Sequence, residues 1–320
     1  MPQFDETLYH TKSAVLFVIF NRPGTTQQVF DAIRAAKPKR LYLAADGPRP
    51  GFPGDALLCK QTREIVGKID WDCQVKTLFK DGNVGCKHAV SAAISWFFSH
   101  EEEGIILEDD CLPANSFFRF CDTLLEKYRQ DTRVRHITGC NLQFGKKWGS
   151  GSYYFSNRTH VWGWASWRRV WDDYNLSLEK YDGAEITKQM KNIYADDLVV
   201  ECWVNIFNEV KTGKINSWAY PLDFANFFNN GLVIIPNENL ISNIGFSAGA
   251  TNTLSDNNAY ANIPLKEIGE ITHPTFMVPE KQADLFIMYN HFNIEEKKRK
   301  RNSLHRRFKR WVKSVFVKAK

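Results

Sequence analysis

The chain has 320 residues, of which 43% are hydrophobic and 14% aromatic, so it can bury a large core in one domain or two. No run approaches the roughly 20 apolar residues that span a bilayer, and the N-terminus is polar, so we expect neither a transmembrane helix nor a secretory signal. The seven cysteines are scattered without CxxC spacing, which argues against a zinc centre or disulfide framework and favours a reduced cytosol.

The net charge of +6 is unevenly distributed along the chain. Twelve of the 42 Lys and Arg residues lie from Lys297 to the end, where there is no acidic residue. The rest of the chain therefore carries more acidic than basic side chains. The basic character belongs to a tail and not to the folded part.

Strands and helices alternate four times in the first third of the chain. The first apolar run, AVLFVIF at 14–20, is continuous and β-rich, as in a strand buried on both faces. Further strands are expected in RLYLAADGP, which stops at Asp46, at 73–79, and in the run that ends at Glu108. Helices are expected from Thr25 or Thr26 to Arg34, at about 55–68, and at 87–98. This order predicts an α/β fold with a mostly parallel, doubly wound, Rossmann-like sheet flanked by helices.

After Pro113 the pattern changes to a mixture of helices and short strands. Helices are predicted at 115–129 and 198–210, and strands in RHITGC at 135–140 and in GLVIIP at 231–236. We divide the chain into an extension at 1–12, a main domain at 13–262, a wrapping segment at 263–292 and a basic tail at 293–320. The main domain has a first half at about 13–112 and a second, α+β half at about 113–262.

The most informative feature is the acidic run Glu108-Asp109-Asp110 in GIILEDDCLP. It follows a buried strand, at the edge of an open α/β sheet where ligands bind. Adjacent carboxylates repel one another and resist desolvation, and a hard divalent cation carrying a diphosphate would relieve that repulsion. The alternative is a solvated acidic turn before Pro113.

Four further residues could contact a ligand at this edge. Arg22 follows the first strand and Asp46 ends the second, so both could contact a base, a sugar or a phosphate. The alternatives are a surface position for Arg22 and a turn-capping role for Asp46. Lys87 and His88 open a helix whose N-terminus favours anions, so they could hold a diphosphate opposite the acids. A lone histidine on a helix is more often a packed or surface residue.

The segment HVWGWASWRRVWDDY at 160–174 is unusually aromatic. Trp162 and Trp164 flank Gly163 in a predicted loop-to-helix turn, and an aromatic face can stack on a sugar ring of an acceptor. The alternative for most of these residues is burial on one helix face, formed by Trp164, Trp167 and Trp171.

Several acidic residues could act as a general base. The candidates are Asp172, Asp173, Asp196, Asp197 and Asp223. We favour Asp223, because it lies among aromatic residues in SWAYPLDF and not in a polar run. No Ser-His-Asp elbow, P-loop or dinucleotide-binding fingerprint is present.

The basic tail has the pattern of an amphipathic helix. Lys and Arg occupy one face, and the apolar residues of the other are Leu304, Phe308, Trp311, Val312, Val315 and Phe316. Because Trp and Phe gather on one face, the pattern favours an anionic membrane surface over nucleic acid. Residues 297–320 are therefore predicted to attach the protein to the cytoplasmic face of the cell membrane.

Taken in this order, the segments resemble a GT-A fold glycosyltransferase of the nucleotide-diphospho-sugar transferase superfamily. The likeness is to the inverting N-acetylglucosaminyltransferase I family and its bacterial relatives, over roughly residues 14–250. VLFVIFNRP is similar to that family's first strand with its nucleotide-contacting Arg, here Arg22. LAADGP is similar to the second strand, whose Asp contacts the uracil, here Asp46. CKHAVSAAISWFF is similar to the helix with a nucleotide-contacting His, here His88.

The acidic segment carries the strongest resemblance, because IILEDDCLPANSFFRF is similar to the EDD form of the family's DxD motif. It implies that Asp110 ligates Mn²⁺ (or Mg²⁺), with Asp109 and Glu108 around the sugar and ribose. VWGWASW resembles the aromatic acceptor-side segment, and IPNENLISNIGF resembles the late loop over the donor. The family's base follows a Trp in an acidic pair, but that position is Ala219 here, which leaves Asp223 as the nearest acid.

The resemblance implies a metal-dependent, inverting glycosyltransferase with a donor half at 13–112 and an acceptor half at 113–262. Its partners would be a nucleotide-sugar donor, with UDP expected, and a saccharide or lipid-linked saccharide acceptor in surface polysaccharide or glycolipid synthesis; no nucleic acid is expected. Two alternatives remain open. One is a sugar nucleotidyltransferase, against which the single glycine in NRPGTTQ counts. The other is a non-catalytic sugar-binding module.

Overall fold

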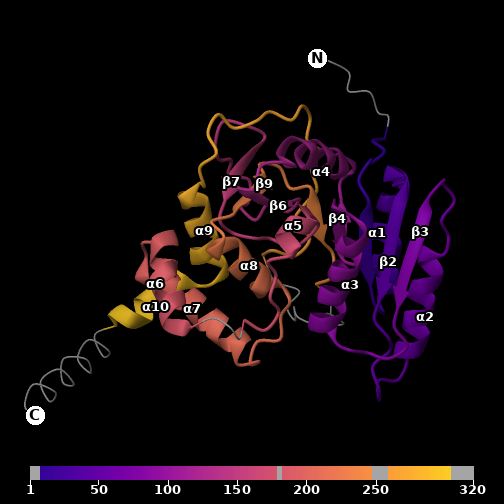
Figure 1. The fold of residues 1–320 in the computed structure, drawn as a ribbon, viewed down its shortest axis with the longest axis horizontal. Coiled ribbons are helices and arrows are strands. Elements are labelled where there is room, and N and C mark those ends of the chain that lie inside the picture. Colours follow the sequence, from indigo (N-terminus) through magenta and orange to yellow (C-terminus); the bar gives the residue numbers. More distant parts are fainter. Residues whose placement is uncertain (1–7, 179–181, 247–258, 304–320) are drawn as a thin grey trace, which may run out of the picture.

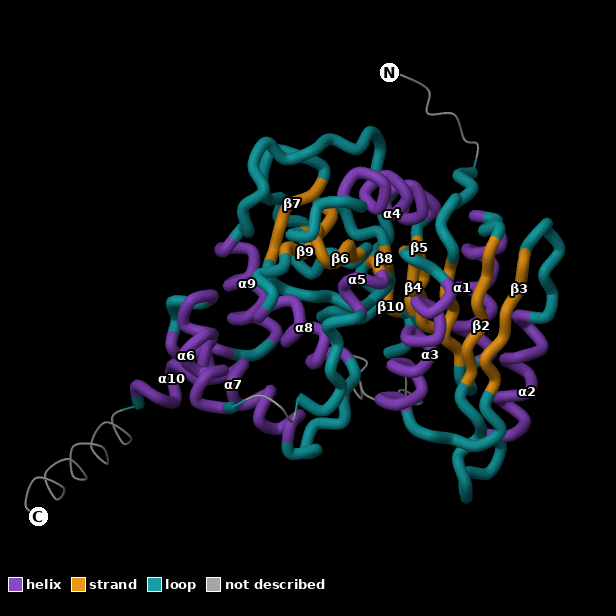
Figure 2. Tube along the Cα trace, in the orientation of Figure 1, coloured by secondary structure: helices purple, strands orange, loops and turns teal. Residues whose placement is uncertain are grey.

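A mixed β-sheet forms the centre of the described part of the molecule (Figures 1 and 2). The computed structural model describes residues 8–178, 182–246 and 259–303. In these residues the sheet has eight strands in the order β3-β2-β1-β4-β8-β6-β9-β7. It passes without a break from the first half of the chain to the second, so the two halves share one framework.

The first half forms the parallel part of the sheet. Its strands are β1 (Val15–Ile19), β2 (Arg40–Ala45), β3 (Gln74–Phe79) and β4 (Glu103–Glu108), with parallel pairing of β1 to both β2 and β4. Its helices are α1 (Pro23–Ala36), α2 (Asp55–Val66) and α3 (Cys86–His100). The expected α/β class, with a mostly parallel, Rossmann-like sheet flanked by helices, is confirmed. Helix α1 begins two residues before Thr25, because Pro23 suits the first helical position.

Alternate residues of β1 build the two faces of the core. Phe17 and Ile19 belong to the cluster that α1 and α4 (Asn115–Tyr128) cover, whereas Leu16 and Val18 belong to the cluster that α3 covers. This period-two arrangement buries β1 on both sides and explains its continuous apolar sequence. With both faces of the sheet covered, a ligand can reach these strands at their carboxyl ends.

The second half extends the sheet with parallel and antiparallel strands. The strands are β6 (Val134–Thr138), β7 (Tyr153–Ser156), β8 (Trp164–Trp167) and β9 (Leu232–Pro236), with a separate pair of β5 (Cys111–Pro113) and β10 (Ile241–Asn243). The helices are α5 (Arg168–Trp171), α6 (Gly183–Ile193), α7 (Asp197–Lys211), α8 (Ala219–Phe228), α9 (Lys281–His291) and α10 (Ile294–Asn302). Helices α6, α7 and α10 form a lobe at the end of the molecule away from β3 (Figure 1).

The shared helix face predicted for three tryptophans is wrong. Trp164 and Trp167 belong to strand β8, and only the short helix α5 follows, with Trp171 at its end. Residues three apart in a strand point to opposite faces of the sheet. Trp164 accordingly joins the cluster under α3, and Trp167 joins the cluster under α4. Burial of these indoles was predicted correctly, but the element that buries them was not.

The predicted membrane helix falls mainly on residues 304–320, which lie outside the described part of the chain. The described helix α10 carries the start of the basic run and is attached to the lobe through the fully buried Ile294. Among the described residues we find no helix with both the length and the apolar character needed to cross a bilayer.

Candidate active site

Strands β1 and β4 end side by side at the point where the strand order of the sheet reverses. Because β2 and β4 lie on opposite sides of β1, the connections that leave these strands diverge and open a crevice at their carboxyl ends. Glu108 is the last residue of β4 and lies opposite Val18 of β1, and Asp109 and Asp110 follow directly. The acidic run therefore lies at the edge of the sheet where it was predicted.

The Arg22 guanidinium contacts two of the three acids. It forms one ion pair with Asp109 and a second with Asp110, in which Nη1 lies 2.9 Å from Oδ2. The backbone N–H of Phe20 also donates to Asp109 Oδ2, at 3.3 Å. Asp109 is only 3% exposed, so its charge is compensated inside the protein. The relief of repulsion that we expected from a metal is provided here by Arg22.

The third acid, Glu108, has no such partner. Its carboxylate forms no hydrogen bond or ion pair with any described residue. Burial, together with the charges of Asp110 and Asp109, raises the pKa of Glu108 far above that of a free carboxyl. Burial also raises the pKa of Asp109, against the opposing effect of Arg22. Glu108 is therefore the acid that would gain most from a bound hydroxyl group or cation.

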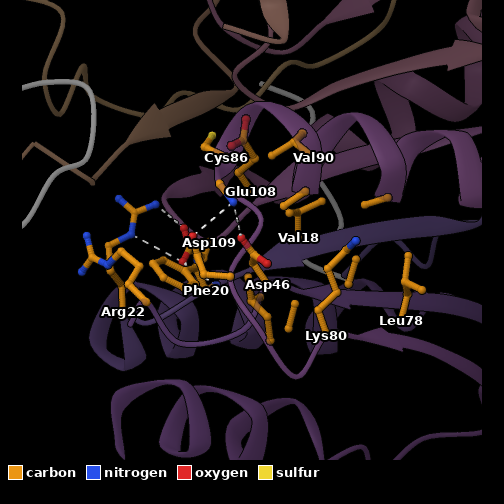
Figure 3. A pocket seen from close by; sticks show the side chains of 18 of the residues that line it. Val18, Phe20, Arg22, Asp46, Leu78, Lys80, Cys86, Val90, Glu108 and Asp109 are labelled. Carbon is orange, nitrogen blue, oxygen red and sulfur yellow. Dashed lines mark hydrogen bonds and ion pairs between the residues drawn. The ribbon is translucent and has the colours of Figure 1, made fainter. Parts of the chain in front are cut away.

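A narrow cavity of about 250 Å³ opens beside the acids, between the strand ends and α3 (Figure 3). Its apolar wall consists of Val18, Ile19, Ala44, Ala45, Leu78, Val90 and Ala93. Polar groups reach it from Arg22, Asp46, Lys80, Glu108 and Asp109. The volume is close to the lower end of the roughly 300–1,000 Å³ range of small-molecule pockets, which suits a single ring system. We refer to it as the apolar cavity.

Asp46 lines the apolar cavity, but its carboxylate is used within the protein. Its oxygens accept hydrogen bonds from the backbone N–H groups of Gly47 at 2.9 Å, Val84 at 3.1 Å and Gly85 at 3.0 Å. These bonds hold the loop that leads into α3. The turn-capping alternative thus describes the observed contacts of Asp46, whereas a contact with a nucleotide stays a prediction.

Helix α3 turns a different set of residues toward the apolar cavity than we expected. The lining residues are Cys86, Ala89, Val90 and Ala93, which recur at helical spacing. Lys87 and His88 fall between these positions and do not line it; His88 is exposed and faces a separate shallow depression beside Tyr174. Lys80, which we missed, follows β3 directly, so the strand-end argument used for Asp46 would have found it.

A second, larger cavity of about 620 Å³ adjoins the first. We call it the polar cavity; its wall includes Asp110, Arg158, His160, Trp162, Ala219 and Asp223. Four residues line both cavities, and they are Arg22, Cys86, Glu108 and Asn216. The acidic run thus lies at the junction of the two cavities.

The aromatic candidates separate into one accessible and one buried residue. Trp162 lines the polar cavity and packs edge-on against Phe246, with ring centroids 5.8 Å apart. Trp164 is 1% exposed and stacks on His136 at 4.9 Å, so it offers no free face to a sugar. Gly163 does not line the cavity; its φ of 58° and its approach to Ile241, which a Cβ would overlap, explain the glycine.

Only one of the proposed acidic bases lines the polar cavity. Asp223 does so from α8, where Arg158 Nη1 donates to its Oδ1 at 2.9 Å. Asp173 instead pairs with Arg135, and Asp196 caps the N-terminus of α7. Burial raises the pKa of Asp223, and the charge of Arg158 opposes this shift.

The late segment predicted to lie over the donor reaches Asp110. Pairing of β10 with β5 brings the Ile244 N–H to 2.8 Å from the Asp110 carbonyl oxygen. A Cβ on Gly245 would overlap the Asp110 carboxylate and come within 2.7 Å of Arg22 Nη1. A glycine is therefore required for the backbone to close over the ion pair. The chain beyond it, residues 247–258, lies outside the described part.

A divalent metal at Asp110 would need ligands beyond those that the described residues supply. The described residues contain no group of three or more His, Cys, Asp or Glu side chains placed to hold an ion. Mg²⁺ sites commonly combine one or two carboxylates with substrate phosphates and water. Asp110 fits that kind of site if Arg22 shares or releases its Oδ2. The residues therefore fit a metal that arrives with a diphosphate, and not a preformed metal centre.

Comparison with known proteins finds only low similarity to solved structures among the matches described below. No protein-family model and no curated protein sequence matches the chain. Similar solved structures include a UDP-glucose pyrophosphorylase complexed with UDP-glucose, 9% identical over 70% of this chain and 90% of that one, with a TM-score of 0.36. Another is a 4-diphosphocytidyl-2C-methyl-D-erythritol synthase from Anaerococcus prevotii, 9% identical over 68% of this chain and 96% of that one, with a TM-score of 0.34. A third is the inositol-1-phosphate CTP transferase from T. maritima, 8% identical over 71% of this chain and 86% of that one, with a TM-score of 0.36. These values are too low to carry an argument about activity.

Replacing Arg22 by Met should lower the free energy of unfolding by on the order of 3 kcal/mol, because Asp109 becomes a buried charge without a partner. Adding Asp109→Asn should recover part of the loss. Urea unfolding of the four proteins of this double-mutant cycle measures the coupling. Arg34→Met is a matched control, because it removes an exposed ion pair with Asp70 and should change the free energy of unfolding little. Strictly additive effects of the two site substitutions would contradict the buried ion pair.

Proposed function

We propose that the protein transfers a sugar from a nucleoside-diphosphate donor, with UDP expected, to a hydroxyl group of a saccharide acceptor, assisted by Mn²⁺ or Mg²⁺. The observation that carries this proposal is the position of the acidic run at the junction of the two cavities. A donor of this kind has an aromatic base at one end, a sugar at the other and a diphosphate between them. The apolar cavity, the junction and the polar cavity offer matching surroundings in the same order.

The junction supplies the charges that a departing diphosphate requires. Arg22 lines both cavities and would turn from the acids toward the phosphates, since a phosphate offers its guanidinium the same bidentate geometry as a carboxylate. Asp110 would hold the metal on the other side. When bound, such a metal neutralises the leaving nucleoside diphosphate. Glu108, which has no partner among the described residues, is available for a hydroxyl of the sugar or ribose.

The transfer itself is a displacement at the anomeric carbon of the donor. The acceptor oxygen forms a bond to that carbon, the bond from the carbon to the β-phosphate oxygen breaks, and the electron pair stays with the leaving diphosphate. The acceptor proton passes to a base in the wall of the polar cavity. By the family resemblance, the configuration at this carbon is inverted. Trp162 supports the acceptor assignment, because its ring lines that cavity and can stack on a sugar.

A sugar nucleotidyltransferase is the second candidate. The similar solved structures include a UDP-glucose pyrophosphorylase and an inositol-1-phosphate CTP transferase, whose TM-scores of 0.36 carry no argument. The short connection between β1 and α1 argues against a nucleotidyltransferase. Only residues 20–22 separate β1 from α1, and α1 opens with Pro23, which has no N–H. A loop whose backbone N–H groups could cradle a triphosphate is therefore missing at this connection.

Mn²⁺ together with the cognate nucleoside diphosphate should stabilise the protein, by about 2.7 kcal/mol at 100 times the dissociation constant. A thermal-shift screen of UDP, GDP, CDP and dTDP with Mn²⁺ identifies that nucleotide. Asp110→Asn should lose most of this stabilisation, because the metal loses its protein ligand. The control Asp172→Asn alters an exposed acid that lines neither cavity and should respond like the wild type. An undiminished shift in Asp110→Asn would rule out the proposed metal ligand.

Product analysis separates the three candidate functions. We expect slow, Mn²⁺-dependent release of a nucleoside diphosphate from one nucleotide sugar, with water in place of the acceptor. A nucleotidyltransferase would instead release pyrophosphate from a nucleoside triphosphate and a sugar 1-phosphate. A sugar-binding module would do neither. Chromatography of both reactions with the wild type and with Asp110→Asn distinguishes these outcomes.

Attachment to an anionic membrane surface stays part of the proposal. It is supported by the sequence pattern of residues 297–320 and by α10, which carries the exposed Lys297, Lys298, Arg299 and Lys300. The full chain should float with phosphatidylcholine vesicles that contain phosphatidylserine and should stay behind with phosphatidylcholine alone. A chain that ends at Ser303 keeps α10 and should bind clearly less. Equal flotation of the two chains would remove the membrane proposal.

A further inference from the structure

The wall of the polar cavity contains a buried segment without regular secondary structure. Residues 157–160, the segment Asn157-Arg158-Thr159-His160, lie between β7 and β8, and each is only 4–7% exposed. Buried backbone outside helices and sheets requires other polar partners. This segment finds them in side chains from three different elements.

Each contact holds one point of the segment. Asp284 of α9 accepts from the Asn157 N–H at 3.0 Å, and Asp223 of α8 accepts from the Thr159 N–H at 3.1 Å. Asn226 of α8 donates to Thr159 Oγ1 at 2.9 Å. His136 of β6 places its Nε2 2.8 Å from the His160 carbonyl oxygen. The segment is therefore fixed at several points by hydrogen bonds, which suits residues that must act at a defined position.

Asp223 is committed to this framework. Its Oδ1 accepts from both the Arg158 guanidinium and the Thr159 N–H. If Asp223 took up the proton of an acceptor hydroxyl, the buried Arg158 would lose the carboxylate with which it forms an ion pair. Arg158 is further enclosed by the Trp203 ring, 4.5 Å from its guanidinium carbon. Asp223 is therefore better suited to hold the segment than to exchange protons.

His160 lies in the same wall and has an uncommitted imidazole. It lines the polar cavity together with Asp110 and Trp162, and its ring forms no hydrogen bond with any described residue. Ala219, at the position where the resembling family carries its base, also lines this cavity and has no group that could accept a proton. A side chain that can accept a proton is thus present in the wall, but it is not the expected one.

We propose that His160 is the catalytic base that accepts the proton of the acceptor hydroxyl, and that Asp223 is a positioning residue. The inference rests on the proposed sugar transfer. As the acceptor oxygen bonds to the anomeric carbon, its proton passes to an imidazole nitrogen of His160. The electron pair of the broken bond leaves with the nucleoside diphosphate, so proton and charge both balance.

The surroundings keep His160 neutral and ready to accept a proton. Burial lowers the pKa of His160 well below that of a free imidazole, and the nearby Arg158, His291 and His136 lower it further. Asp223 is the acid that faces the segment from α8, and Arg158 compensates its charge.

Variants of His160 test the assignment with the nucleotide sugar that the wild type hydrolyses. His160→Gln keeps a polar side chain of similar length but cannot take up the proton, so release of the nucleoside diphosphate should fall at least about 100-fold. Its stabilisation by the nucleoside diphosphate and Mn²⁺ should equal that of the wild type. Added imidazole should restore activity to His160→Ala in a saturable manner. His100→Gln, at the far end of α3, is the control and should behave like the wild type.

The pH profile distinguishes the base from the positioning residue. The wild-type rate should fall at low pH as His160 becomes protonated, and His160→Gln should lack this acidic limb. Asp223→Asn should lower the rate but keep the limb. The assignment is overturned if the limb disappears with Asp223→Asn or His291→Gln, or if imidazole does not rescue His160→Ala. If the wild type releases no nucleoside diphosphate from any donor, the proposed function fails and the assignment of His160 fails with it.

Discussion

The site depends on how the protein accommodates two adjacent carboxylates, one buried and one half-buried. Asp109 and Asp110 repel one another at the end of β4, and the Arg22 guanidinium binds both of them. Arg22 can do so because β1 and β4 are neighbours and end at the same edge of the sheet. The backbone at Gly245 then closes over the pair. Without Arg22, the site would lose the positive charge around which its parts are arranged. These parts are the ends of β1 and β4, the junction of the cavities and the late segment at Gly245.

The parallel half of the fold could be predicted because its signals are local. Each buried strand is a short apolar run ended by a polar turn, and the intervening helices have their own apolar periodicity. The position of the acids followed from the same reasoning, since the carboxyl ends of parallel strands share one edge. The ion pair with Arg22 could not be derived in this way. Nothing near Arg22 in the sequence indicates which way its side chain turns, and we expected a metal in that role.

The errors in the site arose where a residue's orientation depends on distant packing. Lys87 and His88 lie on the predicted helix, but the side of this helix that lines the apolar cavity carries Cys86, Val90 and Ala93. The apolar residues Val90, Ile94 and Phe97 contained that signal, and they mark the buried side of α3. Trp164 and Trp167 were misplaced because a helix and a strand can both bury tryptophans. The partners of segment 157–160 come from residues 24 to 127 positions away, beyond the reach of a local pattern.

The acidic edge and the acceptor side of the site are built in different ways, and this affects how their residues should be interpreted. At the edge, the strands of a regular sheet deliver the acids, so their position follows from the strand pattern of the sequence. On the proposed acceptor side, side chains from β6, α8 and α9 hold an irregular segment, and a base can be moved within the wall without disturbing the sheet.

Ala219 shows that such a change is possible here, because it lines the polar cavity at the position where the resembling family has an acid. As a general base, Asp223 is then a weaker candidate than His160, although Asp223 lies nearer to the expected position. The ring of His160 forms no hydrogen bond with a described residue, and the same side chains hold it in the wall of the polar cavity. Proton transfer and acceptor contact would both belong to the chain from Arg158 to Trp162, and a change in acceptor would be expected to alter this stretch before it alters the acids.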